Sequence, residues 1–224
     1  MKKMKAMVLT LCACIVMMGC NNLGKGTAIG AAGGALLGAV VGKITGNTAV
    51  GAAVGTAVGA GAGALIGKHM DKVKAQAEAV QNAQVQTITD ANGLQGVMLT
   101  FDAGILFATN KADLNANSKS ALNQCATLLK NNADCDIAIY GHTDSTGSDA
   151  VNNPLSVKRA QAVQTYLLGQ GVSATQIRTV DGKGSKEPVA DNSTAAGRQQ
   201  NRRVELYMYA SQAMIDAAES GTLQ

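Results

Sequence analysis

Aromatic residues are scarce in this chain of 224 residues, where they make up 3% and tryptophan is absent. Any core must therefore be built from aliphatic and small side chains, for which the hydrophobic content of 46% is sufficient. Glycine is abundant at 26 residues, but only two prolines occur and no Gly-X-Y period runs through the chain, which excludes a collagen-like fold. The apolar content and the modest charge also exclude a wholly disordered chain.

Basic charge and metal-binding residue types are equally limited. The formal net charge is +4, but three of the lysines stand within residues 1–5, so the rest of the chain has little basic excess. Without a basic patch and stacking aromatics, we expect no nucleic-acid partner. The two histidines are far apart and the five cysteines follow no zinc-type spacing. We therefore expect no metal site and no cofactor.

Residues 1–19 are typical of an export signal. Residues 1–5 are basic and residues 6–18 are almost wholly apolar, a run short for a membrane span but suited to a signal peptide. The run ends at Gly19-Cys20, which resembles the bacterial lipoprotein box, although methionines replace its usual Leu and Ser or Ala. We predict a lipoprotein signal peptide over 1–19, with a plain secretory peptide as the alternative.

Lipidation would make Cys20 the first residue of the exported protein, with residues 20–25 as the lipidated N-terminus. Each buried methylene of an acyl chain contributes about 0.8 kcal/mol, so several chains anchor a protein stably in a membrane. Asn21 follows the cysteine, and by resemblance to the enterobacterial sorting rule this favours the outer membrane. We expect a lipid-anchored outer-membrane protein whose folded domain lies in the periplasm.

Glycine is concentrated in residues 26–67, where it recurs every four residues and the pattern of 27–32 returns in 48–53. This spacing places small residues on one helical stripe, which lets another helix approach closely. We predict a glycine-zipper hairpin with its turn at 43–47, associated with the membrane and prone to form homo-oligomers. A low-complexity spacer and a zipper inside a soluble oligomer are the alternatives.

The remaining chain is divided by composition into three parts. Residues 68–83 are polar and predict an exposed helical linker, residues 84–210 predict a globular domain, and residues 211–224 form a tail with no readable pattern. Strands alternating with helices predict a two-layer α/β fold. Apolar patterning predicts strands at 85–89, 97–101, 136–141, 177–181 and 203–209, and helices at 114–131 and 153–168.

Two cysteines fall inside this domain on positions that predict burial. Cys125 lies on the apolar stripe of its helix, and Cys135 shares parity with the apolar residues of its strand. Both thiols therefore point toward one layer. A disulfide suits an exported protein, whereas two buried free thiols are equally ordinary, so both alternatives stay open.

Arg159 is the most informative residue of the chain, because a helical wheel places it in the middle of the apolar stripe formed by Leu155, Val163 and Tyr166. Arginine is almost never buried unless it is paired. Fifteen residues upstream, Asp144 ends a predicted strand and is delivered near the start of the same helix. An aspartate and an arginine on one cleft suit a zwitterion, whose carboxylate takes the guanidinium and whose ammonium takes the aspartate. The alternative is a structural Asp144–Arg159 salt bridge.

Three motifs in this region resemble the OmpA-like C-terminal domain, which binds peptidoglycan in outer-membrane protein A, peptidoglycan-associated lipoprotein and flagellar-motor stator proteins. The motifs stand at 141–147 (GHTDSTG), at 152–160 (NNPLSVKRA) and at 197–205 (GRQQNRRVE). The resemblance covers about residues 97–209 and implies a two-layer domain with a mixed four-stranded sheet and helices on one face. The whole chain is similar to glycine-zipper OmpA-family lipoproteins.

The resemblance also implies residue roles. Asp144 and Arg159 stand where the family grips the diaminopimelate side chain of a peptidoglycan stem peptide, in agreement with the zwitterion interpretation. Asn152 matches a supporting polar position. Either Arg202 or Arg203 adds positive potential, and the predicted site includes Arg203. The full set of predicted ligand-binding residues is Asp144, Arg159, Asn152, Thr143, Leu155, Thr109, Asn110 and Arg203.

The sequence favours binding over catalysis. It has no Gly-x-Ser-x-Gly elbow, no P-loop and no second histidine near His142. We expect a non-covalent tether between the outer membrane and the cell wall. The alternative is a glycine-zipper membrane oligomer or channel that the wall domain only positions. A stator-like motor component is weaker, because no acidic residue stands between Lys25 and Lys68 to carry protons.

Overall fold

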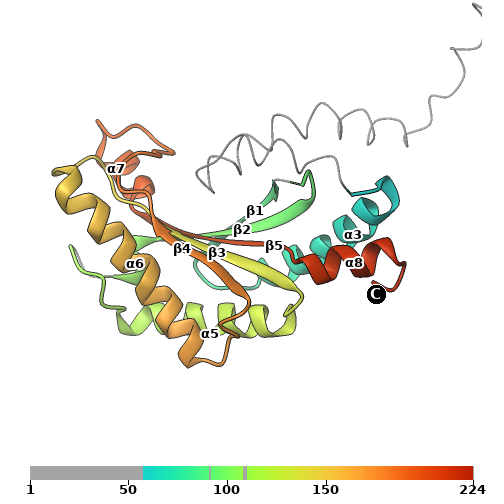
Figure 1. Ribbon diagram of the computed structural model, residues 1–224. Helices are drawn as coiled ribbons and strands as arrows, with labels where there is room; N and C mark the ends of the chain where they lie inside the picture. Colours follow the sequence, from blue (N-terminus) through green and yellow to red (C-terminus); the bar gives the residue numbers. More distant parts are fainter. Residues whose placement is uncertain (1–57, 91, 108–109, 224) are drawn as a thin grey trace, which may run out of the picture.

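The structure, a computed structural model, describes residues 58–90, 92–107 and 110–223 (Figure 1). The predicted signal peptide, the lipidation of Cys20 and the predicted hairpin as far as residue 57 lie outside the described residues. Among the helices of the described part, none has the length and apolar character needed to cross a membrane.

One mixed sheet forms the centre of the domain (Figure 1). Its strand order is β1-β2-β5-β3-β4, and neighbours are antiparallel except for the parallel pair β3 and β4, which helix α6 connects. The mixed sheet of an α/β fold is confirmed. It has the five strands that the apolar patterning predicted rather than the four that the resemblance implied, because the hairpin of β1 and β2 adds an edge strand. The strands are β1 (Ala83–Thr89), β2 (Gln95–Asp102), β3 (Cys135–Gly141), β4 (Ile177–Gly182) and β5 (Arg203–Ala210).

Five of the helices bury apolar side chains against the same face of this sheet, as predicted. Alternate strand residues such as Leu99, Ile139 and Leu206 face these helices in one aliphatic cluster. The opposite face carries a separate, smaller cluster that includes Tyr140 and Tyr207. The helices are α3 (Ala60–Ala77), α4 (Ala103–Leu106), α5 (Ala116–Asn131), α6 (Asp149–Gly169), α7 (Ala195–Asn201) and α8 (Gln212–Glu219), and all of them except α7 contribute to the aliphatic cluster.

Helix α6 begins earlier than its pattern predicted, at Asp149 rather than at residue 153. Pro154 consequently lies in the second turn, where it cannot donate a backbone hydrogen bond, and not in the first turn where proline is well tolerated. Arg159 is buried on this helix beside Val163, as the wheel predicted.

Helix α3 contradicts two predicted boundaries at once. It runs through the predicted end of the hairpin at residue 67 and through most of the predicted linker at 68–83. The predicted linker is not an exposed helix, because its Met70 and Val73 continue the helical spacing of Ile66 and all three are fully buried against the domain. The helix packs on β2 and on α8, so it belongs to the core of the domain.

The tail is likewise an ordered element and not a segment without structure. Residues 212–219 form α8, and the Ser211 hydroxyl caps it by accepting a hydrogen bond from the amide of Met214 at 3.2 Å. Met214, Ile215 and Ala218 are buried, and α8 lies beside α3 in Figure 1. The two helices next to the domain's chain ends therefore pack on each other.

The alternatives for the two domain cysteines are resolved in favour of free thiols. Cys125 and Cys135 are both fully buried and are not joined by a disulfide. Burial raises the pKa of each thiol to about 12. Both behave as small apolar core residues.

Candidate ligand-binding site

Helix α6 is held unusually close to the ends of β3 and β4 by two glycines. A Cβ atom at Gly141 or at Gly182 would overlap atoms of Ser156 on the helix, so only glycine permits this approach. The Ser156 hydroxyl accepts a hydrogen bond from the amide of Gly184 at 2.9 Å, which fastens the helix to the loop after β4. The loop that follows β3 is thereby set against the N-terminal turns of α6.

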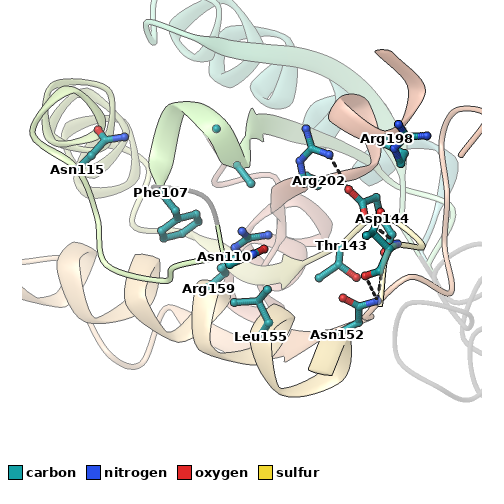
Figure 2. Close-up of a pocket in the computed structure, with 13 residues that line it drawn as sticks. Phe107, Asn110, Asn115, Thr143, Asp144, Asn152, Leu155, Arg159, Arg198 and Arg202 are labelled. Atoms are coloured by element: carbon teal, nitrogen blue, oxygen red, sulfur yellow. Dashed lines mark hydrogen bonds and ion pairs between the residues drawn. The ribbon is translucent and has the colours of Figure 1, made fainter. Parts of the chain in front are cut away.

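A cavity of about 740 Å³ opens at this junction (Figure 2). Its walls come from α4 and the segment after it, the loop after β3, the N-terminal half of α6, and α7. Ionisable side chains on its wall comprise three arginines and one aspartate. The lining residues are Ala103, Gly104, Phe107, Asn110, Asn115, Thr143, Asp144, Thr146, Asn152, Leu155, Arg159, Arg198 and Arg202.

Arg159 reaches the cavity from the buried face of α6 and is only 4% exposed. Its Nε donates a hydrogen bond to the backbone oxygen of Lys111 at 3.2 Å, and its Cζ lies 5.4 Å from the centre of the Phe107 ring, a cation–π contact. Among the described residues, no carboxylate forms an ion pair with it. Burial and the neighbouring charge of Arg202 lower the pKa of Arg159, against the opposing effect of Asp144.

Asp144 lies across the cavity from Arg159, and its partner is Arg202 (Figure 2). The Oδ2 atom accepts a hydrogen bond from Arg202 Nη1 at 2.6 Å, and Oδ1 accepts one from the amide of Thr146 at 2.7 Å. Burial acts to raise the pKa of Asp144, but these hydrogen bonds outweigh it and the pKa lies below its ordinary value. The two predicted residues therefore share one cavity without forming the salt bridge that was the alternative.

Asn152 secures the loop that carries Asp144. Its Nδ2 donates to the backbone oxygens of Asp144 at 3.3 Å and of Thr146 at 3.1 Å, so one side chain on α6 fixes both ends of the turn. Thr143 is held from the other side, because its amide donates to the oxygen of Gly184 at 2.8 Å. The Thr143 hydroxyl oxygen is buried and has no hydrogen-bond partner.

The remaining predicted residues divide into three outcomes. Leu155 and Asn110 line the cavity as predicted, and Asn110 adopts a left-handed backbone conformation with φ of 57°, which asparagine tolerates better than most residues. Thr109 lies outside the described residues. Arg203 was wrongly included, because it is not among the residues that line the cavity.

The error over Arg203 follows from strand alternation. Arg202 caps α7 and points to Asp144, whereas Arg203 begins β5 and shares its face with Glu205 and Tyr207. There its Nε donates to Glu205 Oε1 at 2.6 Å. His142, the residue before Thr143, also turns away from the cavity and lies 3.2 Å from Glu205 Oε2.

Sequence reasoning missed several lining residues. Phe107 and Asn115 line the cavity from segments to which no binding role was given, and neither Arg198 nor Arg202 was chosen from the 197–205 motif. Arg198 and Arg202 belong to the motif at 197–205, so the sequence showed both residues but not the direction in which their side chains point. Three guanidinium groups and one carboxylate suit a ligand that carries carboxylates together with one ammonium.

Comparisons with known proteins agree with the resemblance read from the motifs. Residues 106–202 match the OmpA family, and residues 1–71 match the YMGG-like Gly-zipper family. The peptidoglycan-binding protein ArfA of Mycobacterium tuberculosis is 44% identical over 102 residues, which cover 46% of this chain and 31% of that protein. The probable lipoprotein YiaD of Escherichia coli is 34% identical over 141 residues, which cover 63% of each chain.

Among solved structures, one described as the cell wall anchor of the T6SS from Pseudomonas aeruginosa is similar with a TM-score of 0.53 and 26% identity. The match covers 63% of this chain and 97% of that one. This chain thus spans about a third of the mycobacterial relative and under two thirds of the enterobacterial one.

Proposed function

We propose that this chain, which carries an OmpA-family domain over residues 106–202, binds peptidoglycan non-covalently through the cavity between α4, α6 and α7. The observation that carries the proposal is Arg159, a buried guanidinium that faces a cavity and has no acidic partner among the described residues. A buried charge normally requires a partner. A ligand carboxylate would supply it.

The ligand group we propose is the end of the diaminopimelate side chain in a stem peptide. This group carries an ammonium and a carboxylate on one carbon. The carboxylate would accept hydrogen bonds from the Nη atoms of Arg159, and the ammonium would donate to Asp144. Arg202 occupies only one lone pair of Asp144 Oδ2, so the carboxylate keeps acceptor capacity toward the cavity. Arg198 and Arg202 add positive potential that favours the other carboxylates of the peptide.

Two relatives support wall binding by what their descriptions say. ArfA is named a peptidoglycan-binding protein, and the Pseudomonas structure is described as a cell wall anchor. The OmpA-family match over residues 106–202 includes most of the residues that line the cavity. We infer binding and not catalysis, because the lining offers charge and shape for recognition of a peptide end.

Membrane attachment completes the proposed tether. The Gly-zipper match over residues 1–71 and the similarity to a probable lipoprotein support an N-terminal segment that holds the outer membrane through Cys20 and the zipper. Helix α3 continues out of this segment and packs on the domain, so a pull on the membrane anchor would be transmitted directly to the wall-binding part. The domain would then lie in the periplasm.

Co-sedimentation with purified peptidoglycan tests the binding step. The fragment should begin at residue 58, because α3 supplies core residues that a shorter fragment would lose. Asp144→Asn and Arg159→Met should leave the fragment in the supernatant. Arg178→Gln is the matched control, since this exposed arginine pairs with Asp136 on the sheet and lies outside the cavity. If the folded wild-type fragment does not pellet, wall binding is wrong.

A change of wall chemistry tests the diaminopimelate proposal separately. Peptidoglycan with lysine in place of diaminopimelate keeps the side-chain ammonium but lacks the neighbouring carboxylate. The fragment should bind it at least about tenfold more weakly, which corresponds to the loss of one charge-assisted contact of about 1.4 kcal/mol or more. Equal binding to both walls would leave wall binding intact and refute the role given to Arg159.

A second candidate function rests on the Gly-zipper match, which covers residues 1–71 and not the cavity. A zipper-driven oligomer could conduct ions across a bilayer, with the domain only positioning it. The full chain and the fragment from residue 58 should then differ in bilayer conductance. Conductance by the full chain that persists in Arg159→Met would favour this function over the tether.

A further inference from the structure

A second cluster of chemically reactive side chains lies where α3 meets the start of β3, at the far end of that strand from the cavity. The imidazole of His69, the carboxylate of Asp134 and the thiol of Cys135 present donor atoms that all lie within 4.8 Å of one another. The thioether sulfur of Met70 lies 4.0 Å from the Cys135 sulfur. Nothing in the wall-binding proposal uses these groups.

The cluster is poorly satisfied by the protein itself. His69 Nδ1 is buried and has no hydrogen-bond partner, and the contact of Nε2 is the 3.3 Å ion pair with Asp134 Oδ2. Buried polar atoms of this kind call for an explanation, since nearly all of them find partners in folded proteins. The Cys135 thiol is fully buried and its hydrogen-bond contact is the Met70 sulfur.

We propose that His69, Asp134 and Cys135 bind a zinc ion that joins α3 to β3. Imidazole nitrogen, carboxylate oxygen and thiolate are the three donor types that zinc prefers. Bonds of 2.0–2.3 Å in a tetrahedron place donors about 3.3–3.8 Å apart, so small side-chain rotations suffice to close the present spacing. The fourth position is left to water, with the Met70 thioether beside it.

Zinc binding would release one proton, and the ion can reach the cluster from solvent. The Cys135 thiol loses its proton to solvent as the zinc–sulfur bond forms, while Asp134 and His69 coordinate in their unprotonated forms. Burial raises the pKa of this thiol in the free protein, and a bound cation reverses that effect. The Asp134 side chain is 39% exposed and gives the ion access from solvent.

The consequence is a clip between two segments that are 65 residues apart in the chain, counted from His69 to Asp134. Cross-links that close long loops restrict the unfolded chain most. The ion would strengthen the joint between the N-terminal segment and the domain. Sequence spacing alone excluded a metal site, because the histidine and the cysteine lie on different elements that only the fold brings together.

Zinc titration of the untagged full chain in detergent, with a chromophoric chelator as competitor, tests the clip. Wild type, Cys135→Ser, His69→Gln and the control Cys125→Ser are compared. Cys125 is as buried as Cys135 but lies outside the cluster, and all four proteins keep the N-terminal cysteines, so any background binding cancels. We expect Cys125→Ser to bind zinc as tightly as wild type. The two cluster variants should bind zinc more than about 100-fold more weakly, which exceeds the 10–100-fold loss typical when a residue that only supports a metal ligand is removed.

Two further measurements distinguish a residue that coordinates zinc from one that only packs in the core. Zinc should raise the melting temperature of wild type and of Cys125→Ser but not of the cluster variants. Cobalt should give a thiolate charge-transfer absorption that Cys135→Ser loses. If Cys135→Ser fails to fold by circular dichroism, His69→Gln decides, since His69 lies near the surface with 17% of its side chain exposed. Equal zinc affinity in wild type and His69→Gln, or binding of Cu(I) without zinc, overturns the proposal.

Discussion

Arg159 and Arg203 are buried to the same extent, 4% exposed each, yet their surroundings differ in kind. Arg203 donates to Glu205 Oε1 at 2.6 Å, to the oxygen of Asn201 at 3.3 Å and to the oxygen of Glu187 at 3.1 Å. Arg159 donates one hydrogen bond, to a backbone oxygen, and otherwise faces the cavity. Of two equally buried arginines, one is thus paired with a carboxylate and the other faces an open cavity.

The charged network around Arg203 extends to two further side chains. The Tyr207 hydroxyl donates to Glu205 Oε2 at 2.6 Å, and His142 Nε2 lies 3.2 Å from the same oxygen. Burial acts to raise the pKa of Glu205, but His142, Arg203 and Tyr207 outweigh it and hold the pKa at about 2. We conclude that burial alone does not identify a ligand-binding arginine, whereas unused hydrogen-bonding capacity beside a cavity does.

Replacement of Arg203 should have the largest effect on stability. Arg203→Met leaves the buried carboxylate of Glu205 without its cation, and breaking a buried pair in this way costs about 3–5 kcal/mol. Urea denaturation of the fragment from residue 58 measures the loss, with Arg178→Met as an exposed control that should change stability by less than about 1 kcal/mol. A loss no greater than that of the control would show that the network is not structural.

Acid should weaken the same network in a defined direction. The pKa of Glu205 is lowered from 4.5 to about 2, so its contribution to stability is present above pH 4.5 and is lost as the pH falls toward 2. Glu205→Gln lacks this titration. The stability difference between wild type and variant should therefore shrink from pH 7 to pH 2, as followed by urea denaturation. A constant difference across that range would contradict the depressed pKa.

Gly141→Ala should disturb both the network around Arg203 and the cavity beside Arg159. Gly141 lies on β3 directly before His142, and α6 packs on it. The added methyl group overlaps Ser156, and overpacking of this kind costs about 1–3 kcal/mol. Displacement of α6 should also move Arg159 relative to Asp144 and weaken wall binding. Gly169→Ala is the control, since a Cβ there meets no atom within 4 Å. Full binding by Gly141→Ala would show that the close approach of α6 does not set the cavity.

The sequence predicted what depends on local periodicity. The helical wheel placed Arg159 on a buried stripe, and alternation gave the strands to within a few residues. The position of Asp144 beside the same cavity followed from a strand end that returns into the helix. These predictions succeeded because each rests on a short stretch of chain and one repeat period.

The errors concern contacts between distant segments. Arg202 and Arg203 are adjacent, and the start of β5 at Arg203, which pairs with Asp102 of β2, leaves Arg202 and not Arg203 facing the cavity. Helix α3 was predicted in two parts, as the end of the hairpin up to residue 67 and as an exposed linker after it, because this division split the narrow stripe of Ile66, Met70 and Val73. Such an apolar stripe is buried only when another element covers it. Helix α8 provides part of that cover, and its residues were predicted as a tail without a readable pattern.

Replacement of Arg159 should have the smallest effect on stability and the clearest effect on binding. Arg159→Met removes a buried charge that has no ionic partner, so the desolvation penalty disappears together with one hydrogen bond. The methionine sulfur can still contact the Phe107 ring, which offsets part of the lost cation–π contact. We expect the free energy of unfolding to change by less than about 1 kcal/mol, while co-sedimentation with peptidoglycan is lost. A destabilisation as large as that of Arg203→Met would make Arg159 a structural residue, because an arginine that the fold itself requires has no need of a ligand.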